Sequence, residues 1–283
     1  IAASKAETGA ALTKILPDGA LSRNFQLPAG LAGERCLANA FAESPPSLML
    51  AGNGMSEGDG IMQSLWVKKD DLAQTRWLDS EAPAVGEGQI LLAVEKYALT
   101  ANNITYAVVG DGFGYWNFFP TGEADWGIVP VWGFARVVAS QYGDIAVGER
   151  VYGYLPMASH LLVTPGNVQA GGFIDGAPHR QGLAIIYNQY HRLGTDAGAH
   201  EAERAIFQPL FTTSFLIEHF MRAHDWFGAE SLVMTSASSK TSMGLAMVAK
   251  SLSPAIRRIG LTSAGNRAFV EQTGLYDVVL AYE

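Results

Sequence analysis

Residues 229–252, AESLVMTSASSKTSMGLAMVAKSL, contain an apolar run, a polar loop and a helical pattern in immediate succession. The apolar run predicts a buried strand, and the apolar spacing after Lys240 predicts a helix. A loop in this position presents free backbone N–H groups at the positive end of the helix dipole, where phosphate binds well. Serine is also a preferred capping residue of ordinary helices. Taken alone, the loop is therefore compatible with either a phosphate site or a simple cap.

The sequence after this stretch supplies the context that the loop lacks. RRIGLTS and YDVVLAYE predict two further strands, and GNRAFVEQTG predicts a helix between them. The resulting β-α-β-α-β order is half of a doubly wound dinucleotide-binding fold. A complete fold of this type needs about as many residues again, so the sequence predicts a C-terminally truncated part of a longer enzyme. This context favours the phosphate site.

The polar residues of the loop and of the second strand end then have expected roles. Hydroxyl groups replace the usual glycines, Lys240 offers a positive charge, and Gly244 allows close packing of the helix against the strand. No carboxylate occurs between Arg258 and Val270, where NAD-selective sites usually place one, which favours NADP. Arg267 is equally compatible with a solvated helix position. The expected NADP-binding residues are Ser236, Ser238, Ser239, Lys240, Thr241, Gly244, Thr262, Ser263 and Arg267.

Composition excludes several classes of protein. The chain has 283 residues, of which 48% are hydrophobic and 16% charged, and its net charge of −8 lowers the expectation of nucleic-acid binding. Cys36 is the only cysteine, so no disulfide framework or thiolate zinc site is expected, and a reducing cytoplasm fits best. The sequence contains no uninterrupted apolar run of about 20 residues, which argues against a membrane span. A small molecule is the expected partner.

The pattern changes along the chain in three steps. Residues 1–61 are rich in Ala, Gly, Pro and Ser, and predict a poorly ordered extension with at most a short helix at residues 2–16. Residues 62–200 contain short strand-like runs separated by Gly and Pro, typical of a small barrel. Toward its end, LAIIYNQYHRL favours helix. Residues 201–283 begin with a longer helical stretch that Pro209 is expected to divide into two helices.

The order of these segments resembles the medium-chain dehydrogenase/reductase superfamily from about Leu65 to Glu283. The resemblance is carried by GEGQILLAVEKYALTANNITYAVVGD, PVWGFARVVAS, DIAVGERVYGYLPMASHLLVTP and LFTTSFLI. It is most specific for a branch catalogued as a domain of unknown function, which shares the Asn-Asn-Ile-Thr-Tyr and Ser-Ala-Ser-Ser-Lys-Thr segments. It implies a GroES-like β-barrel with the substrate site, followed by a Rossmann domain, and hydride transfer with NADP. Relatives are often dimers, which allows a homodimer of the full-length protein.

The resemblance also suggests how such an enzyme would work without a metal. Gly133-Phe134-Ala135 occupies the place where zinc alcohol dehydrogenases carry Gly-His-Glu, so two metal-site residues are missing and no metal site is expected. In zinc-free relatives, the residue matching Asn103 lines the nicotinamide pocket. Tyr106 lies where a proton donor is needed, and Thr213 matches a contact to the nicotinamide riboside.

Each of these three residues also has a structural interpretation. Asn103 is compatible with a turn, Tyr106 with a phenol bonded to a backbone carbonyl, and Thr213 with a helix-start cap. The aromatic segment 111–120, DGFGYWNFFP, suits a flat substrate or a core, and Tyr187 and Asn188 face either the cleft or the surface.

The sequence therefore predicts a zinc-independent, NADPH-dependent oxidoreductase acting on an activated carbonyl, enone or quinone. The alternatives are a non-catalytic nucleotide-binding protein on the same fold, or a lyase or isomerase that uses the same cleft without redox chemistry.

Overall fold

The computed structural model describes residues 60–194 and 201–282. Nearly all of the expected N-terminal extension, including the short helix at residues 2–16 and Cys36, lies outside the described residues. The chain divides into two compact units, one ending at Ala205 and the other beginning at Ile206. We call the described part of the first the barrel unit and the described part of the second the Rossmann unit.

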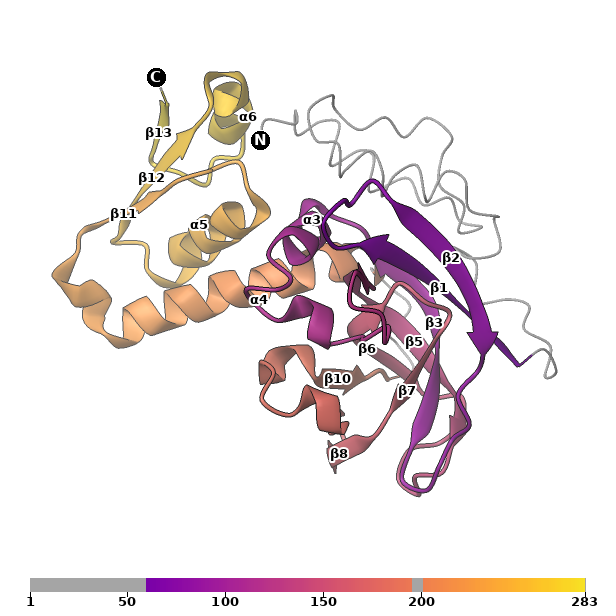
Figure 1. The fold of residues 1–283 in the computed structure, drawn as a ribbon. Helices are drawn as coiled ribbons and strands as arrows, with labels where there is room; N and C mark the ends of the chain where they lie inside the picture. The colour runs from indigo at the N-terminus through magenta and orange to yellow at the C-terminus, as the bar shows by residue number, and fades with distance from the viewer. Residues whose placement is uncertain (1–59, 195–200, 283) are drawn as a thin grey trace. The chain divides into compact units, whose positions relative to one another are not determined.

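The barrel unit is built around a seven-stranded antiparallel sheet that curls into a half-barrel (Figure 1). Its strand order is β7-β3-β5-β6-β10-β9-β8, and a second sheet has the order β2-β1-β4. The strands are β1 (Ile61–Lys68), β2 (Thr75–Glu81), β3 (Ile90–Ala98), β4 (Trp126–Gly127), β5 (Pro130–Ser140), β6 (Arg150–Pro156), β7 (His160–Val163), β8 (Pro165–Gln169), β9 (Gly172–Asp175) and β10 (Gln189–Arg192). The expected GroES-like β-barrel domain is therefore confirmed, and its main sheet is a half-barrel.

The strands of the barrel unit meet in one continuous core. β6 is the central element, because every residue from Val151 to Pro156 is buried. Branched and aromatic side chains of β3 and β5 pack around it, and each fully buried residue of this size contributes about 1.5–3 kcal/mol through its removal from water. One helix, α3 (Ala101–Val108), and two short 3-10 helices, η2 (Tyr115–Asn117) and η4 (Ile185–Tyr187), carry side chains that pack on one part of this core. A further 3-10 helix, η3 (Pro178–Arg180), carries the buried Arg180.

The prediction of a helix for LAIIYNQYHRL is wrong. This segment forms the single turn η4 followed by strand β10, which pairs with β6 and β9. The segment contains Ile185, Ile186 and two tyrosines, which favour extended structure. The edges of two existing strands then supply hydrogen bonds that the local pattern could not anticipate.

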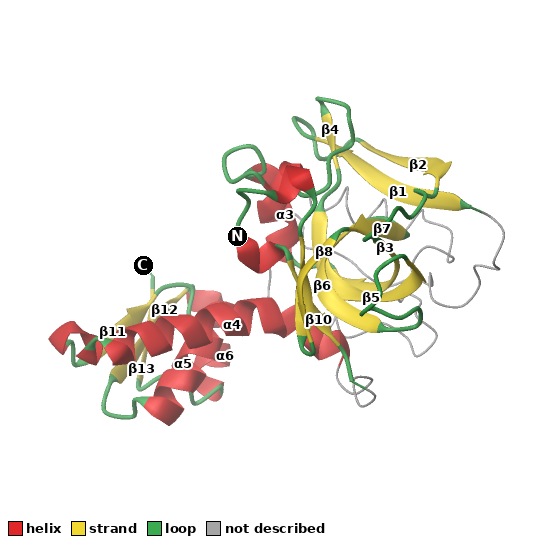
Figure 2. Cartoon of the chain, turned by 90° about the horizontal axis from the view of Figure 1, so that it is seen from below, coloured by secondary structure: helices red, strands yellow, loops and turns green. Residues whose placement is uncertain are grey.

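The Rossmann unit has a parallel three-stranded sheet with α-helices between its strands (Figure 2). Strand order is β11-β12-β13, so the predicted β-α-β-α-β run is confirmed. Its elements after the long first helix are η5 (Asp225–Gly228), β11 (Ser231–Met234), α5 (Lys240–Leu252), β12 (Arg257–Thr262), η6 (Ala264–Asn266), α6 (Arg267–Gln272) and β13 (Val278–Ala281). None of the described helices is long and apolar enough to cross a membrane.

The expected break at Pro209 is also wrong. Helix α4 (Glu201–Ala223) is continuous, with Pro209 inside it. An interior proline removes one main-chain hydrogen bond and weakens the preceding turn. Contacts on both sides hold the helix: Glu201 is ion-paired at its start, and Ser214 and Glu218 are fully buried in its second half.

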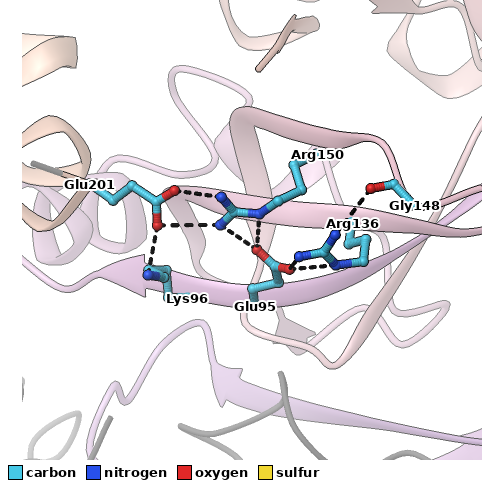
Figure 3. Close-up of polar contacts among 6 residues, drawn as sticks. All are labelled: Glu95, Lys96, Arg136, Gly148, Arg150 and Glu201. Carbon is cyan, nitrogen blue, oxygen red and sulfur yellow. Dashed lines mark hydrogen bonds and ion pairs between the residues drawn. The ribbon is translucent and has the colours of Figure 1, made fainter. Parts of the chain in front are cut away.

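The first turn of α4 is fixed by a network of charges on the barrel unit (Figure 3). Glu201 accepts hydrogen bonds from Arg150 and forms an ion pair of 2.6 Å with Lys96. Arg150 also donates to Glu95, which pairs with Arg136. Burial acts to raise the pKa of Glu201, but the hydrogen bonds from Arg150 and Lys96 outweigh it and hold this pKa below its usual value. Glu201 is therefore a charged anchor.

Candidate functional site

The loop between β11 and α5 has an unusual backbone at its start. Ser236 has a φ of 49°, in the left-handed region that non-glycine residues seldom occupy. The strain of such a conformation is characteristic of ligand-binding loops. The Ser236 N–H donates to the Tyr282 hydroxyl at 2.6 Å, and the Ser236 carbonyl accepts from the N–H of Ser239. Ser236 thus takes a left-handed conformation, which glycine adopts without strain.

Part of the serine content serves as a helix cap. Ser239 is the N-cap of α5, and its hydroxyl oxygen accepts the N–H of Ser242 at 3.2 Å. The Ser242 hydroxyl in turn donates to the carbonyl of Thr235. The capping interpretation is correct for Ser239, and it leaves the first turn of α5 open. The N–H groups of Lys240 and Thr241 have no acceptor among the described residues.

Lys240 is the charged residue of this loop. Its side chain is half-buried, and its ammonium group has neither a carboxylate nor a carbonyl partner within residues 60–194 and 201–282. Burial lowers the pKa of Lys240 below its ordinary value. A partly desolvated, unpaired ammonium group beside open helix-start amides is a favourable place for an anion.

Gly244 allows close packing, as expected, but its partner is a helix and not a strand. A Cβ atom at Gly244 would lie 2.8 Å from the hydroxyl of Ser214 on α4. That hydroxyl donates to the carbonyls of Leu210 and Thr241. The glycine therefore sets the distance between α4 and α5, because the barrier to a side chain comes from α4.

The end of β12 lies beside the loop. Asn266 in η6 donates its side-chain N–H to the hydroxyl of Ser238 at 3.3 Å. This hydrogen bond joins the segment after β12 to the loop between β11 and α5. Thr262 is fully buried, and Ser263 is the N-cap of η6. Arg267 is exposed and its guanidinium forms an ion pair of 2.8 Å with Glu271 one turn later. Its assignment to a 2'-phosphate stays a prediction, as do the assignments of Thr262 and Ser263.

In the barrel unit, Asn103 has a structural partner for each polar atom. Its side-chain oxygen accepts from the N–H of Thr100 at 2.6 Å, and its side-chain nitrogen donates to the carbonyl of Pro130 at 2.8 Å. With Thr100 it forms the capping box of α3. Asn103 therefore fixes the helix that carries Tyr106, whereas its proposed contact with nicotinamide stays a prediction.

Tyr106 belongs to a group of four tyrosines from four different elements. We call Tyr106 (α3), Tyr115 (η2), Tyr154 (β6) and Tyr187 (η4) the tyrosine cluster. Tyr106 has its ring centre 4.7 Å from that of Tyr115 and 5.6 Å from that of Tyr154. Tyr187 closes the group, with its ring centre 4.7 Å from Tyr154 and 5.6 Å from Tyr115.

The hydroxyl groups of this cluster use only part of their hydrogen-bonding capacity. The indole N–H of Trp132 donates to the Tyr106 hydroxyl at 3.3 Å, and the hydroxyls of Tyr115 and Tyr187 lie 3.2 Å apart. The backbone-carbonyl partner considered for Tyr106 is thus replaced by an indole. The Tyr154 hydroxyl is buried without a hydrogen-bond partner in the described part of the chain.

Burial keeps the phenols of Tyr106, Tyr154 and Tyr187 protonated. It is the main cause that raises the pKa of Tyr106, with the nearby Tyr115 hydroxyl adding to it and the Trp132 hydrogen bond opposing it. The pKa values of Tyr154 and Tyr187 are raised by burial first and further by neighbouring phenols. Neutral phenols donate hydrogen bonds to acceptor oxygens across the physiological pH range.

The predicted riboside contact and the residues at the zinc-enzyme positions lie in regular secondary structure. Thr213 is exposed in the middle of α4, where its hydroxyl donates to the carbonyl of Pro209. A helix-start cap is therefore excluded, because the helix begins at Glu201. Phe134 and Ala135 are fully buried in β5. No group of three or more His, Cys, Asp or Glu side chains that could hold a metal occurs among the described residues.

Sequence reasoning missed several residues that the structure brings to these sites. Tyr154 lies in a strand whose residues after Arg150 are all apolar or aromatic, so nothing distinguishes it locally. Tyr282 follows the last strand and reaches the phosphate-loop candidate only through the parallel sheet. Arg180 and Asp175 form a buried ion pair behind the cluster, and no spacing rule connects them to Tyr187.

Comparison with known families gives a match over most of the chain. Residues 97–283 match the family described as Protein of unknown function (DUF2855). The chain belongs to the DUF2855 family. The expected membership of an uncharacterised branch is thereby confirmed. No curated protein matches the chain.

Solved structures share the fold of this DUF2855 protein. CurA from Vibrio vulnificus has a TM-score of 0.52 at 15% identity, over 78% of this chain and 57% of that chain. CurA from the same organism in complex with NADPH gives 0.50 at 16% identity, over 78% and 58%. A putative NADPH:quinone reductase from Mesorhizobium loti gives 0.51 at 15% identity, over 80% and 61%. The chain thus shares the fold of these proteins and spans less than two thirds of their length.

Proposed function

We propose that this DUF2855 protein is a zinc-independent, NADPH-dependent oxidoreductase that reduces an activated carbonyl, enone or quinone. The observation that carries the proposal is the loop from Ser236 to Thr241, with its strained start, open amides and unpaired Lys240. The shared fold adds support, since one similar structure is of a putative NADPH:quinone reductase and another is a complex with NADPH.

The residues present fit the phosphates of a nucleotide. Lys240 supplies one positive charge, the N–H groups of Lys240 and Thr241 supply open donors, and the dipole of α5 favours negative charge at this end. Asn266 adds an amide beside Ser238, at the place where NAD-selective proteins usually have an acid. We assign the nicotinamide ribose and 2'-phosphate contacts to Thr213, Thr262, Ser263 and Arg267 as further parts of this proposal.

We propose that the Tyr106 hydroxyl donates a proton to the reduced substrate. When bound, NADPH supplies a hydride, that is, one proton with two electrons, to a substrate carbon. The substrate oxygen or the adjacent carbon then gains negative charge and takes a proton from the Tyr106 hydroxyl or from water. The Trp132 N–H donates to the Tyr106 oxygen, so it stabilises the phenolate that forms until solvent returns the proton. Asn103 holds α3 and thereby positions Tyr106.

Metal-free chemistry fits the side chains of β5. Phe134 and Ala135 offer no ligand atoms at the positions where the zinc enzymes carry theirs, and both are buried in the sheet. Charge that develops on the substrate would then be stabilised by hydrogen-bond donors, as in an oxyanion hole.

A non-catalytic nucleotide-binding protein is the second candidate. The observation that favours it is the full engagement of Asn103 by Thr100 and Pro130, which leaves the expected nicotinamide-pocket residue occupied. Binding of NADP without oxidation of NADPH would select this candidate.

The first test is NADP binding. We expect NADP at 100 times its dissociation constant to stabilise the protein by about 2.7 kcal/mol, measured as a shift of the melting temperature. Lys240→Ala should weaken NADP binding about tenfold in calorimetric titration, because one charge-assisted contact is lost, and should leave the melting temperature of the free protein nearly unchanged.

Lys250→Ala is the matched control for charge. Lys250 lies on the exposed side of the same helix, where its ammonium donates to the carbonyl of Gly274. The Lys250→Ala variant should bind NADP with the same affinity as the unmodified protein. Equal affinity of Lys240→Ala and the unmodified protein would disprove the phosphate assignment. NADPH oxidation with a panel of enones and quinones then separates the enzyme from the second candidate.

A further inference from the structure

The tyrosine cluster contains two hydrogen-bond donors that can still donate to a ligand: the Tyr106 hydroxyl and the Tyr115–Tyr187 pair. The Tyr106 hydroxyl accepts from Trp132, so its own proton remains free for another acceptor. Tyr115 and Tyr187 share one hydrogen bond at 3.2 Å, and whichever of them accepts keeps its proton free. These donors come from different elements, α3 for the first and η2 with η4 for the second.

The two donors lie against one group of rings. Tyr106 and Tyr187 have ring centres 6.4 Å apart and meet edge to face, while the Tyr115 ring touches both. Tyr115 and Tyr187 are partly exposed, whereas Tyr106 is 8% exposed. Tyr115 and Tyr187 therefore offer their paired hydroxyls to a ligand that approaches from solvent, and the ring of the more deeply buried Tyr106 packs against both of their rings.

The charges around the tyrosine cluster indicate that its ligand is neutral. Arg180 donates to the main-chain carbonyl of Tyr187, and it is 1% exposed, covered by Phe118 and Phe119 and paired with Asp175 at 3.1 Å. The cluster therefore presents only neutral donors to a ligand. Burial and mutual proximity of the phenols keep them neutral, because both raise the pKa values of Tyr106 and Tyr187. Acceptor oxygens of carbonyl or hydroxyl groups are the matching chemistry.

We propose that the Tyr115–Tyr187 pair is a second acceptor site of the substrate pocket, so that the preferred substrate is a flat, neutral compound with two acceptor oxygens. One oxygen binds Tyr106, where the proposed proton transfer occurs, and the other binds the Tyr115–Tyr187 pair. This inference rests on the proposed function and narrows its substrate class. It distinguishes Tyr106, which acts on the reacting oxygen, from Tyr187, which acts on specificity.

Arg180 is the positioning residue for this second site. Its guanidinium donates to the side-chain oxygen of Asn188 at 3.2 Å and to the carbonyl of Tyr187 at 3.4 Å. The Asn188 side chain donates back to the carbonyl of Arg180. Since Asn188 is the next residue after Tyr187, this reciprocal pair fixes the turn η4 and with it the direction of the Tyr187 ring.

The test compares two substrates that differ in one oxygen. The probes are 2-cyclohexen-1-one, with one carbonyl, and 2-cyclohexene-1,4-dione, with two. Tyr187→Phe keeps the ring and removes the hydroxyl. We expect it to raise KM for the dione about tenfold, as for the loss of one hydrogen bond, with kcat unchanged, and to leave KM for the enone within about twofold. Tyr106→Phe should lower kcat for both.

Tyr142→Phe is the control, because Tyr142 is a partly buried tyrosine that packs on the same core outside the cluster. It should change neither constant. Asn188→Ala tests the positioning residue's partner, and it should raise KM for the dione alone while circular dichroism and the melting curve show a folded protein. Rescue by Asn188→Gln toward the original KM would support positioning over general loss of structure.

Direct binding separates this inference from the proposed function. Cyclohexane-1,4-dione and cyclohexanone are titrated calorimetrically into the protein without NADPH, for the unmodified chain and for Tyr187→Phe. A loss of affinity confined to the dione supports the second site even if no substrate is reduced, in which case the oxidoreductase proposal fails alone. An equal effect on both ketones, or no effect on either, overturns the second site.

Discussion

The tyrosine cluster and the Ser236–Thr241 loop are surrounded by very different structures. The cluster belongs to one continuous core that extends through β3, β5 and β6. The loop lies on a thin sheet with two small groups of buried side chains, and Val233, Met247 and Leu280 are 56%, 48% and 47% exposed. The rings of the cluster are held by packing on several sides. The loop depends instead on main-chain atoms and on a few close approaches.

This difference determines which substitutions the two units tolerate. In the barrel unit a buried charge near the cluster has no access to water, so the loss of its partner cannot be relieved by solvent. In the Rossmann unit most charged groups are exposed, and only positions where two elements touch closely resist change. The predictions below test this contrast in order of decreasing effect.

The largest effect is expected for Arg180→Met. Asp175 and Arg180 both have side chains that are 1% exposed, so the substitution leaves a buried carboxylate without its cation. We expect the free energy of unfolding of the barrel unit to fall by about 3–5 kcal/mol, measured by urea denaturation with tryptophan fluorescence. Arg180→Lys should lose less, since it keeps the charge but not the planar fork of donors.

Arg267→Met is the matched control in the Rossmann unit. Its ion pair with Glu271 joins two side chains that are about half exposed, and such pairs contribute about 0–1 kcal/mol. If Arg180→Met and Arg267→Met change stability by equal amounts, the contrast between the two units is wrong.

A smaller effect is expected for Gly244→Val. The new Cβ atom would lie 2.8 Å from the Ser214 hydroxyl, which is itself bonded to two carbonyls and cannot move freely. Overpacking of this type costs about 1–3 kcal/mol, visible as a lower melting temperature. Gly265→Val is the control, because a Cβ at Gly265 meets no atom within 4 Å. Similar melting temperatures for the two variants would show that α4 and α5 can separate easily.

The same contrast explains what could be predicted from the sequence. The Rossmann unit was predictable because its strands, helices and capping serines follow one another along the chain, and each has a local pattern. The helix cap at Ser239, the packing role of Gly244 and the missing acid after β12 are all properties of short segments. The partner of Gly244 was not predictable, since Ser214 belongs to a helix that precedes the strand.

The tyrosine cluster could be predicted only in part. Tyr106 was found through its family motif, and Tyr187 was noted as a polar and aromatic candidate, but Tyr154 and the pairing of Tyr115 with Tyr187 were not found. These residues come from a helix, two 3-10 helices and a strand that are far apart in the sequence and pack together only in the fold, so no sequence period predicts their contact. For the same reason the local pattern of η4 and β10 favours a helix, whereas the hydrogen bonds of β10 come from strands elsewhere in the sequence.

The smallest expected effect is a change of NADP affinity with pH. Burial lowers the pKa of Lys240 from 10.5, so its ammonium group begins to lose its proton at a lower pH than a solvated lysine does. A neutral amine no longer attracts phosphate, and NADP affinity should therefore fall as the pH rises through this lowered pKa. We expect the decrease in affinity to begin at a lower pH than it would for a solvated lysine, measured by calorimetric titration over a series of pH values, with Lys250→Ala showing the same decrease.

Lys240→Ala should remove this dependence and bind NADP weakly at every pH. Stability of the free protein should respond with the opposite sign. The unfolded chain binds the Lys240 proton more tightly than the folded chain, so the contribution of this residue to the free energy of unfolding rises as the pH increases through the lowered pKa. A free protein that gains stability over the same pH range in which it loses NADP affinity would locate both effects at Lys240. If the affinity of Lys240→Ala falls with pH as steeply as that of the unmodified protein, another group controls the titration.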